Sequence, residues 1–258
     1  MAAGSKEMSF WDHLEELRGT LFRSILAVCL LSVIFLSIKG PLFKAVLWPA
    51  TPDFILYRWL GLDFNMSLIN IDISAQFFVH LKMSLLCGVV IAFPYIIYEV
   101  WRFIAPALYD NEKVAVGRAF KMSSFLFYLG VAVGYFVVLP VCLMFFMNYT
   151  VSDSVENTIS LQSYISMFVS MVFLIGLIFE FPTVIMILSN LGIIHREDLK
   201  KYRRHAIIVV LVLAALITPS DPFSMFVLAI PLYGLYEFSI LICKPADPEE
   251  EESHDLTE

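Results

Sequence analysis

The sequence predicts an all-α integral membrane protein that crosses a lipid bilayer six times. Hydrophobic residues make up 59% of its 258 positions and charged residues only 16%, whereas soluble domains have about half apolar and a quarter charged residues. Several apolar runs reach the roughly 20 residues that a helix needs to cross a hydrocarbon core of about 30 Å. Lys and Arg are divided unevenly among the segments between these runs. These observations favour a membrane protein over a soluble domain.

Each expected span is an apolar run that ends at polar or helix-breaking residues. The clear runs are 21–38, 77–98, 125–147, 164–191 and 223–243. A further run, 206–217, would rise only about 18 Å as a helix. Because the segments around it must alternate sides, we count it as a short fifth span. The Pro-rich stretch 218–222 that follows stops a helix, since proline has no amide hydrogen.

Residues 1–243 are expected to form one six-span domain, and residues 244–258 a disordered acidic tail. Proline kinks membrane helices without destroying them, and Pro94, Pro182 and Pro231 lie similarly within three spans. Shared kinks would curve the bundle into a concave wall. The last twelve residues hold seven acids and no Lys or Arg, and such a block of like charge repels itself.

The distribution of basic residues predicts that both termini face the cytoplasm. With the N-terminus inside, the inner segments hold thirteen Lys and Arg and the outer loops only Lys39, Lys44 and Arg58. Inner loops of membrane proteins carry this excess of positive charge. The long first outer loop, 39–76, contains several Trp and Tyr residues, which favour the membrane interface, so we expect it to lie as a cap on the outer surface.

The motifs of several enzyme classes are missing from the sequence. It has no His-Glu-x-x-His zinc motif, no Gly-x-Ser-x-Gly elbow and no phosphate-binding glycine loop. The four cysteines are scattered through apolar runs without the spacing of a metal or disulfide framework. We therefore expect no enzyme activity, no catalytic residue, no metal or other cofactor, and no nucleic-acid partner.

The segment 9–18 is predicted to form an amphipathic helix before the first span. Its apolar residues, among them Leu14 and Leu17, recur at helical spacing, so the stripe that they form should lie on the inner membrane surface. Asp12 and Glu16 then share a face. They are either acids favoured by the dipole at a helix N-terminus or an anionic patch that binds a cationic ligand.

Two further acids are candidates for function. Glu112 follows the first inner loop and is either an ordinary solvated acid or a second carboxylate facing the same inner surface as Glu16. Glu180 lies near the middle of the fourth span. A charge there costs about 2.5–3.5 kcal/mol on insertion scales, and such residues normally face a bundle interior or a wet cavity. We interpret Glu180 as a functional residue.

Six stretches, in this order along the chain, carry a family pattern. They are His13-Leu-Glu-Glu-Leu-Arg18, Trp101-Arg-Phe-Ile-Ala-Pro-Ala-Leu-Tyr109 followed by Glu112, Gly134-Tyr-Phe-Val-Val-Leu-Pro140, Phe179-Glu-Phe-Pro182, Leu216-Ile-Thr-Pro219 with Asp221, and Ile230-Pro231 with Glu237. Together with the expected topology, they resemble the TatC family, the multi-spanning subunit of the twin-arginine protein translocase. The resemblance covers about residues 10–243.

This resemblance implies a receptor that recognises the paired arginines of signal peptides. With the single-span partners TatA and TatB, in an oligomeric complex in the bacterial cytoplasmic membrane, it would move folded proteins across the lipid using the proton-motive force. The resemblance places signal-peptide contacts on Glu16 and Glu112, with Arg18 and Phe103 beside them. It also implies structural or functional roles for a second group of residues: Pro49, Pro94, Glu180 and Asp221.

Two residues depart from the family pattern, and two other function classes stay open. Glu99 and Met225 stand where the pattern leads us to expect uncharged polar residues. A secondary transporter with Glu180 as a proton-coupled site is the main alternative, although the sequence has no evident inverted repeat. A purely structural membrane scaffold would tolerate replacement of Glu180 and of the inner acids.

Overall fold

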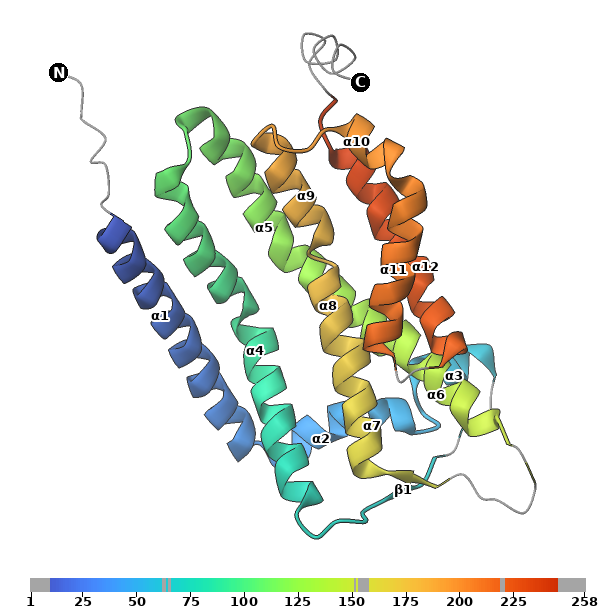
Figure 1. Ribbon diagram of the computed structural model, residues 1–258. Helices are drawn as coiled ribbons and strands as arrows, with labels where there is room; N and C mark the ends of the chain where they lie inside the picture. The colour runs from blue at the N-terminus through green and yellow to red at the C-terminus, as the bar shows by residue number, and fades with distance from the viewer. Residues whose placement is uncertain are drawn as a thin grey trace, which may run out of the picture.

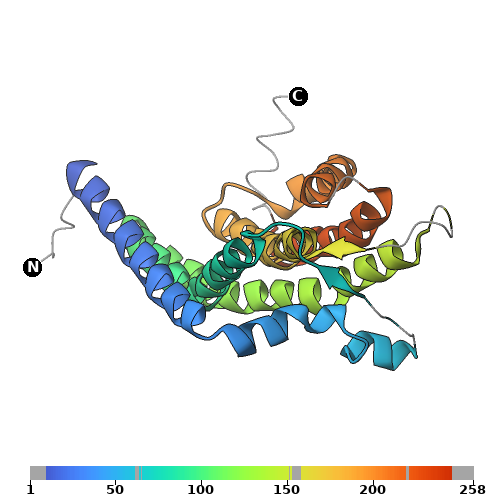
Figure 2. The same ribbon diagram turned by 90° about the horizontal axis from the view of Figure 1, so that it is seen from below.

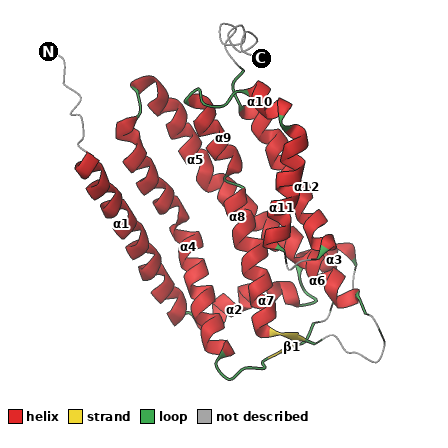
Figure 3. Cartoon of the chain, in the orientation of Figure 1, coloured by secondary structure: helices red, strands yellow, loops and turns green. Residues whose placement is uncertain are grey.

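The computed structural model describes residues 10–245 except for 62, 63, 65, 151, 153–157, 219 and 220. The side chains of residues 10, 12 and 110–112 and all but the first two residues of the expected acidic tail also lie outside the described part. Nearly all of the described chain is helical (Figure 3), which confirms the prediction of a helical membrane protein. The strands within it are two residues long and pair in parallel: β1 (Leu68–Ile69) and β2 (Ile159–Ser160).

The helices follow one another with short connections (Figure 1). In chain order they are α1 (Phe10–Ser37), α2 (Lys39–Leu47), η1 (Trp48–Ala50), α3 (Ile55–Leu60), α4 (Ala75–Ile104), η2 (Ala105–Ala107), α5 (Asp110–Val133), η3 (Gly134–Val138), α6 (Leu139–Asn148), α7 (Leu161–Phe168), η4 (Val169–Leu174), α8 (Ile175–Ile178), α9 (Phe181–Asn190), α10 (Arg196–Lys201), α11 (Arg203–Ile217) and α12 (Pro222–Ile242).

The long helices stand side by side in a row. α1 forms one edge of the row beside α4, and α11 and α12 form the opposite edge (Figures 1 and 2). The start of α1 and the end of α12 lie at the same end of the molecule, whereas α2, α3 and the two strands lie at the other end. We call these the α10 end and the strand end.

Five helical segments of the described chain are long and apolar enough to cross a membrane. They are His13–Ser37, Ala75–Ala107, Lys113–Asn148, Leu161–Asn190 and Pro222–Ile242. The second and third extend beyond the spans expected at 77–98 and 125–147, because the helices continue past the apolar runs at the α10 end. The apolar run therefore marks the length of the hydrocarbon core and not the length of the helix.

α11 is shorter than these five segments. It has 15 residues, three more than the apolar run 206–217, because it begins at Arg203. At 1.5 Å per residue it rises about 22 Å, which is still less than a hydrocarbon core of about 30 Å. α11 packs against α12.

The helix expected over residues 9–18 is present from Phe10, but it is not separate from the first span. α1 runs unbroken from Phe10 to Ser37, so its amphipathic start and its apolar remainder form one helix. The segment contains no proline, and a single Gly19 costs a helix only about 1 kcal/mol relative to alanine. No residue in this stretch forces the backbone to leave the helical hydrogen-bond ladder.

The central helices cross closely at glycines. A Cβ atom at Gly134 would lie 2.5 Å from the carbonyl oxygen of Met171, and one at Gly130 would lie 2.6 Å from the ring of Phe179. Side chains do not fit at such distances, and small residues are what allow membrane helices to approach each other. Gly134 and Met171 lie in the π-helical turns η3 and η4, which pack against each other.

The loop expected as an outer cap folds into α2, η1 and α3 and packs on α6 and η3. Its core is aromatic: Phe54 and Tyr57 are fully buried and their rings lie 5.6 Å apart. The Tyr57 hydroxyl donates a hydrogen bond to the Pro49 carbonyl oxygen at 2.8 Å. Burial raises the pKa of Tyr57 well above its usual value, so the hydroxyl stays protonated and keeps donating. Pro49, predicted to be structural, is buried within this cap.

Candidate functional site

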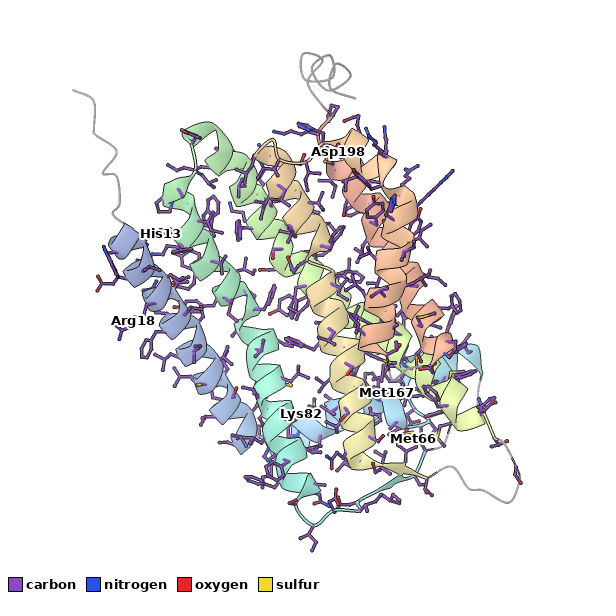
Figure 4. The ribbon with its side chains drawn as sticks, in the orientation of Figure 1. His13, Arg18, Met66, Lys82, Met167 and Asp198 are labelled. Atoms are coloured by element: carbon purple, nitrogen blue, oxygen red, sulfur yellow. The ribbon has the colours of Figure 1, made fainter. Side chains whose placement is uncertain are left out.

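Three contacts join α1 to α4. At the α10 end the His13 ring stacks on the Phe103 ring with centroids 4.5 Å apart, and Figure 4 shows His13 turned toward α4. Further along, the Arg23 Nε donates to the Glu99 Oε2 at 2.8 Å. Near the middle of α4, a Cβ on Gly88 would collide with the Ser32 side chain. These contacts fix the position of α1, which makes most of its helix contacts with α4.

The first of these contacts defines the corner where the predicted site residues lie. Glu16 is half-buried and follows His13 by three residues, so both lie on one face of α1. Phe103 is half-buried near the end of α4. Glu112 belongs to the first turn of α5, which begins just beyond η2, but its side chain lies outside the described part.

Arg18 has a different orientation from His13. It is exposed and lies on the side of α1 away from α4 (Figure 4). The structure therefore brings Glu16 to the corner with His13 and Phe103, and leaves Arg18 on the outer face of α1. A residue on that face can meet a ligand that wraps around α1, but it does not contact Phe103.

The ion pair of Arg23 and Glu99 is a feature that the sequence analysis missed. The Glu99 side chain is 2% exposed and the Arg23 side chain 37%. Arg23 also donates to the Thr20 hydroxyl at 3.3 Å. Glu99 was noted only as a departure from the family pattern. One signal in the sequence could have predicted this ion pair. Arg23 and Glu99 are opposite charges that lie at similar distances from the α10 end in two consecutive, antiparallel spans.

Glu180 lies at a break in the fourth span, between α8 and α9. It precedes Phe181 and Pro182, and the lack of an amide hydrogen on Pro182 interrupts the helix there. The Ser123 hydroxyl on α5 donates to the Glu180 Oε2 at 2.6 Å. The buried Thr183 hydroxyl also lies within reach of the Glu180 carboxylate. The expected polar partners of Glu180 are therefore present.

Pro94 and Pro49 each free a carbonyl that a tyrosine from another helix then satisfies. Proline at position i cannot donate to the carbonyl at i−4. The Tyr128 hydroxyl donates to the Val90 carbonyl, four residues before Pro94, at 3.1 Å. Likewise the Tyr135 hydroxyl donates to the Ala45 carbonyl, four residues before Pro49, at 2.6 Å. The two prolines thereby create tertiary hydrogen bonds that a regular helix would not offer.

Replacing Tyr128 with phenylalanine is expected to destabilise the protein by about 1 kcal/mol, the size typical of hydrogen bonds between membrane helices. The Val90 carbonyl lies at the middle of α4, where lipid offers no replacement donor. Thermal unfolding of the purified variant in detergent measures the change. Tyr98→Phe is the matched control, because Tyr98 is 57% exposed. Equal unfolding temperatures for the two variants would contradict this role of Pro94.

Asp221 begins the last helix. Its Oδ1 accepts a hydrogen bond from the Ser224 backbone N–H at 2.6 Å, which is the geometry of a helix N-cap. Its Oδ2 is buried without a partner among the described residues. The sequence assigned Asp221 a role only through the family pattern, and the structure gives it a structural one: it fixes the turn between α11 and α12.

The described residues of this arrangement offer carboxylates and stacked rings that can bind a ligand. They do not include a set of side chains typical of a catalytic site. Within the described residues no group of three or more His, Cys, Asp or Glu side chains is close enough to hold a metal ion. The corner can hold a cation, because Glu16 offers a carboxylate on the face of α1 that also carries His13, whose ring stacks on Phe103.

Comparison with known families agrees with the six stretches. Residues 12–231 match the family model described as Sec-independent protein translocase protein (TatC). The chain belongs to the TatC family. It is therefore a membrane subunit of the Sec-independent, twin-arginine protein translocase and not an enzyme, and the small-solute transporter considered above is set aside.

Two TatC proteins from other bacteria match this chain over most of their length. The chain is 38% identical over 252 residues to the TatC protein of Blattabacterium, covering 92% of this chain and 95% of that protein. It is 33% identical over 232 residues to the TatC protein of Escherichia coli, covering 90% and 86%. The crystal structure titled twin arginine translocase receptor TatC is also similar, with 35% identity, a TM-score of 0.73, and coverage of 89% of this chain and 97% of that one.

Proposed function

We propose that this chain is the signal-peptide receptor of a twin-arginine translocase and binds paired arginines at the α10 end. The observation that carries the proposal is the stacking of His13 on Phe103 at 4.5 Å. This contact joins the start of α1 to the end of α4, just before α5. Glu16 lies on the same face of α1 as His13, and α5, whose first turn contains Glu112, begins shortly after Phe103 in the chain.

In this proposal Glu16 and Glu112 each accept one guanidinium group. A carboxylate and a guanidinium match as two parallel hydrogen bonds, which an ammonium group cannot make. Phe103 offers a ring face on which a guanidinium can stack. Arg18, on the outer face of α1, contacts the part of the peptide that wraps around α1.

The proposed topology has six spans with both termini in the cytoplasm of a bacterium. The start of α1 and the end of α12 lie at the same end of the molecule (Figure 1), which an even number of crossings requires. The thirteen basic residues expected inside support the cytoplasmic assignment of that end. α11 then serves as the short fifth span. The mismatch between its length and the thickness of the bilayer is met by local thinning of the bilayer or by oligomerisation.

The partners proposed for this receptor are TatA- and TatB-type single-span subunits in an oligomeric complex, with the proton-motive force driving transport. The support is membership of the family together with Glu180, a half-buried carboxylate within the fourth span that accepts a hydrogen bond from Ser123. The predicted concave wall of proline-kinked helices would hold the peptide's apolar segment.

Magnitudes show how such a site must work. A charge pair at 4 Å contributes at most about 4 kcal/mol at an effective dielectric near 20, and an exposed pair under about 1 kcal/mol. Micromolar binding requires about 8 kcal/mol. The apolar segment of the signal peptide must therefore supply much of the affinity, and the acids set specificity for arginine.

The test is peptide binding to Glu16→Gln, Glu112→Gln and the double variant, purified in detergent. Fluorescence anisotropy compares an Arg-Arg signal peptide with its Lys-Lys counterpart. We expect the double variant to bind the Arg-Arg peptide at least about tenfold more weakly, a loss of about 1.4 kcal/mol, and to lose discrimination between the peptides. Glu15→Gln removes the same charge at an exposed neighbouring position and is the control. Unchanged discrimination in the double variant would move the recognition site elsewhere.

A further inference from the structure

An apolar cavity lies at the opposite edge of the row from the α1–α4 corner. Its volume is about 320 Å³, and α8–α9, α10, α11 and α12 surround it. Its walls are almost entirely hydrocarbon: Phe181, Leu199, Val209, Val210, Leu213 and Leu232. Ligand pockets have volumes of about 300–1,000 Å³, so this cavity suits one narrow apolar group.

The cavity is open to the lipid along one face of α11. Tyr202, Ala206, Val209 and Leu213 line it and recur at helical spacing. Val209 is 56% and Leu213 40% exposed. From Tyr202 to Leu213 the helix rises about 17 Å, about half of a hydrocarbon core of about 30 Å. The cavity thus has the length of an acyl chain in one leaflet.

The end of the cavity near α10 has a net positive charge. Residues 196–205 hold five Lys and Arg against the two acids Glu197 and Asp198, and four of the five basic residues lie in the stretch 200–205. Tyr202 and His205 line the mouth itself, with ring centroids 5.7 Å apart. Arg203 is paired with Glu237 at 2.8 Å, but the exposed Lys200 on α10 has no such acid in the structure as described. Basic groups at the mouth of a groove between membrane helices bind anionic lipid headgroups.

We propose that this cavity binds one anionic phospholipid from the leaflet at the α10 end. One acyl chain lies in the cavity against Val209 and Leu213. The phosphate lies over the basic stretch 200–205, at the depth where Tyr202 marks the membrane interface. The charge of this stretch argues for a lipid over the apolar segment of a peptide, which would bring cationic residues to the same mouth.

The test uses the purified full-length chain in detergent, titrated with palmitoyl-oleoyl phosphatidylglycerol or with phosphatidylcholine of the same acyl chains. Native mass spectrometry counts the bound lipids. Val209→Trp fills the cavity. Ile208→Trp is the matched control, because Ile208 is exposed to a similar extent on α11 (62% against 56%) but does not line the cavity. Ala206→Phe fills the same space if Val209→Trp fails to fold. Lys200→Gln with Lys201→Gln removes charge at the mouth, and Arg118→Gln with Lys121→Gln removes the same charge elsewhere.

We expect phosphatidylglycerol to bind Val209→Trp at least about tenfold more weakly than Ile208→Trp, since the buried acyl methylenes are lost. The mouth variant should lose its preference for phosphatidylglycerol over phosphatidylcholine, while the charge control keeps it. Equal binding to Val209→Trp and Ile208→Trp would overturn the proposal. If phosphatidylglycerol and phosphatidylcholine bound equally well, and Val209→Trp weakened both, the proposed recognition of the headgroup would be overturned. A twin-arginine signal peptide could also occupy the cavity. If the peptide displaced the lipid, and if Val209→Trp abolished binding of the peptide itself, the cavity would be assigned to the peptide.

Discussion

Replacing Arg23 with methionine is expected to destabilise the protein by about 3 kcal/mol, the low end for removing one partner of a buried ion pair. The reason is that Glu99, only 2% exposed, would lose its Arg23 donor inside the interface of α1 and α4 and keep only the Tyr95 hydroxyl as a known side-chain donor. Arg23 itself is 37% exposed, which places the estimate at the low end of that range.

The same geometry predicts an asymmetry between the two partners. Glu99→Met leaves an arginine that can extend its charged end toward the headgroups, so it should cost less than Arg23→Met. The double variant should be nearly as stable as the parent, because replacing both charges by apolar groups removes the desolvation penalty. Thermal unfolding of the four proteins in one detergent completes this double-mutant cycle. If Glu99→Met proved the more destabilising single change, Glu99 would not be the group that depends on its partner.

Replacing Glu180 with leucine is expected to lower the rate of cargo transport by at least about tenfold, about 1.4 kcal/mol in the barrier, while the protein folds normally. Leucine removes an insertion cost of about 2.5–3.5 kcal/mol. Ser123, which loses its acceptor, can turn its hydroxyl to a carbonyl of its own helix. Stability should therefore be kept or raised, and any loss of transport reports on the carboxylate itself.

Two variants separate the roles of the Glu180 carboxylate. Glu180→Gln keeps an acceptor for Ser123 but cannot carry a charge, and Ser123→Ala removes the hydrogen bond but keeps the charge. Transport of a twin-arginine precursor into inverted membrane vesicles, with partner subunits at normal and reduced levels, measures the effect. Normal transport by Glu180→Leu at both levels would leave the residue without a transport function. A defect in Ser123→Ala equal to that of Glu180→Leu would assign the effect to the hydrogen bond.

Much of the helical fold could be predicted because lipid imposes simple rules on sequence. A backbone in hydrocarbon must satisfy its own polar groups, so an apolar run such as 223–243 predicts a helix directly, and α12 occupies Pro222–Ile242. The helix ends outside the lipid obey no such rule. α5 begins at Asp110, far before the apolar run at 125, because helical propensity and packing continue it into water.

The candidate site was predictable in residue type but not in geometry. Glu16 could be named because an acid among basic inner segments is unusual. The stacking of His13 on Phe103 and the pairing of Arg23 with Glu99 depend on how α1 is rotated against α4. The close approach at Gly88 sets that rotation, and a glycine within an apolar run gives no sign of its partner. The tyrosines that satisfy the carbonyls before Pro49 and Pro94 were missed for the same reason.

The paired π-helical turns, η3 and η4, are places where the transmembrane core can lose one residue without losing its register. Each such turn holds one more residue than an α-helical turn at the same place. Deleting one residue from Gly134–Val138 would therefore restore a regular helix and leave the orientation of the helix after it unchanged. Leu139, Cys142 and Leu143, at most 1% exposed, would stay in the core together. A deletion inside a regular helix such as α12 would instead rotate everything after it by about 100°. Members of the family can therefore differ by one residue between Gly134 and Pro140, but not within the regular helices.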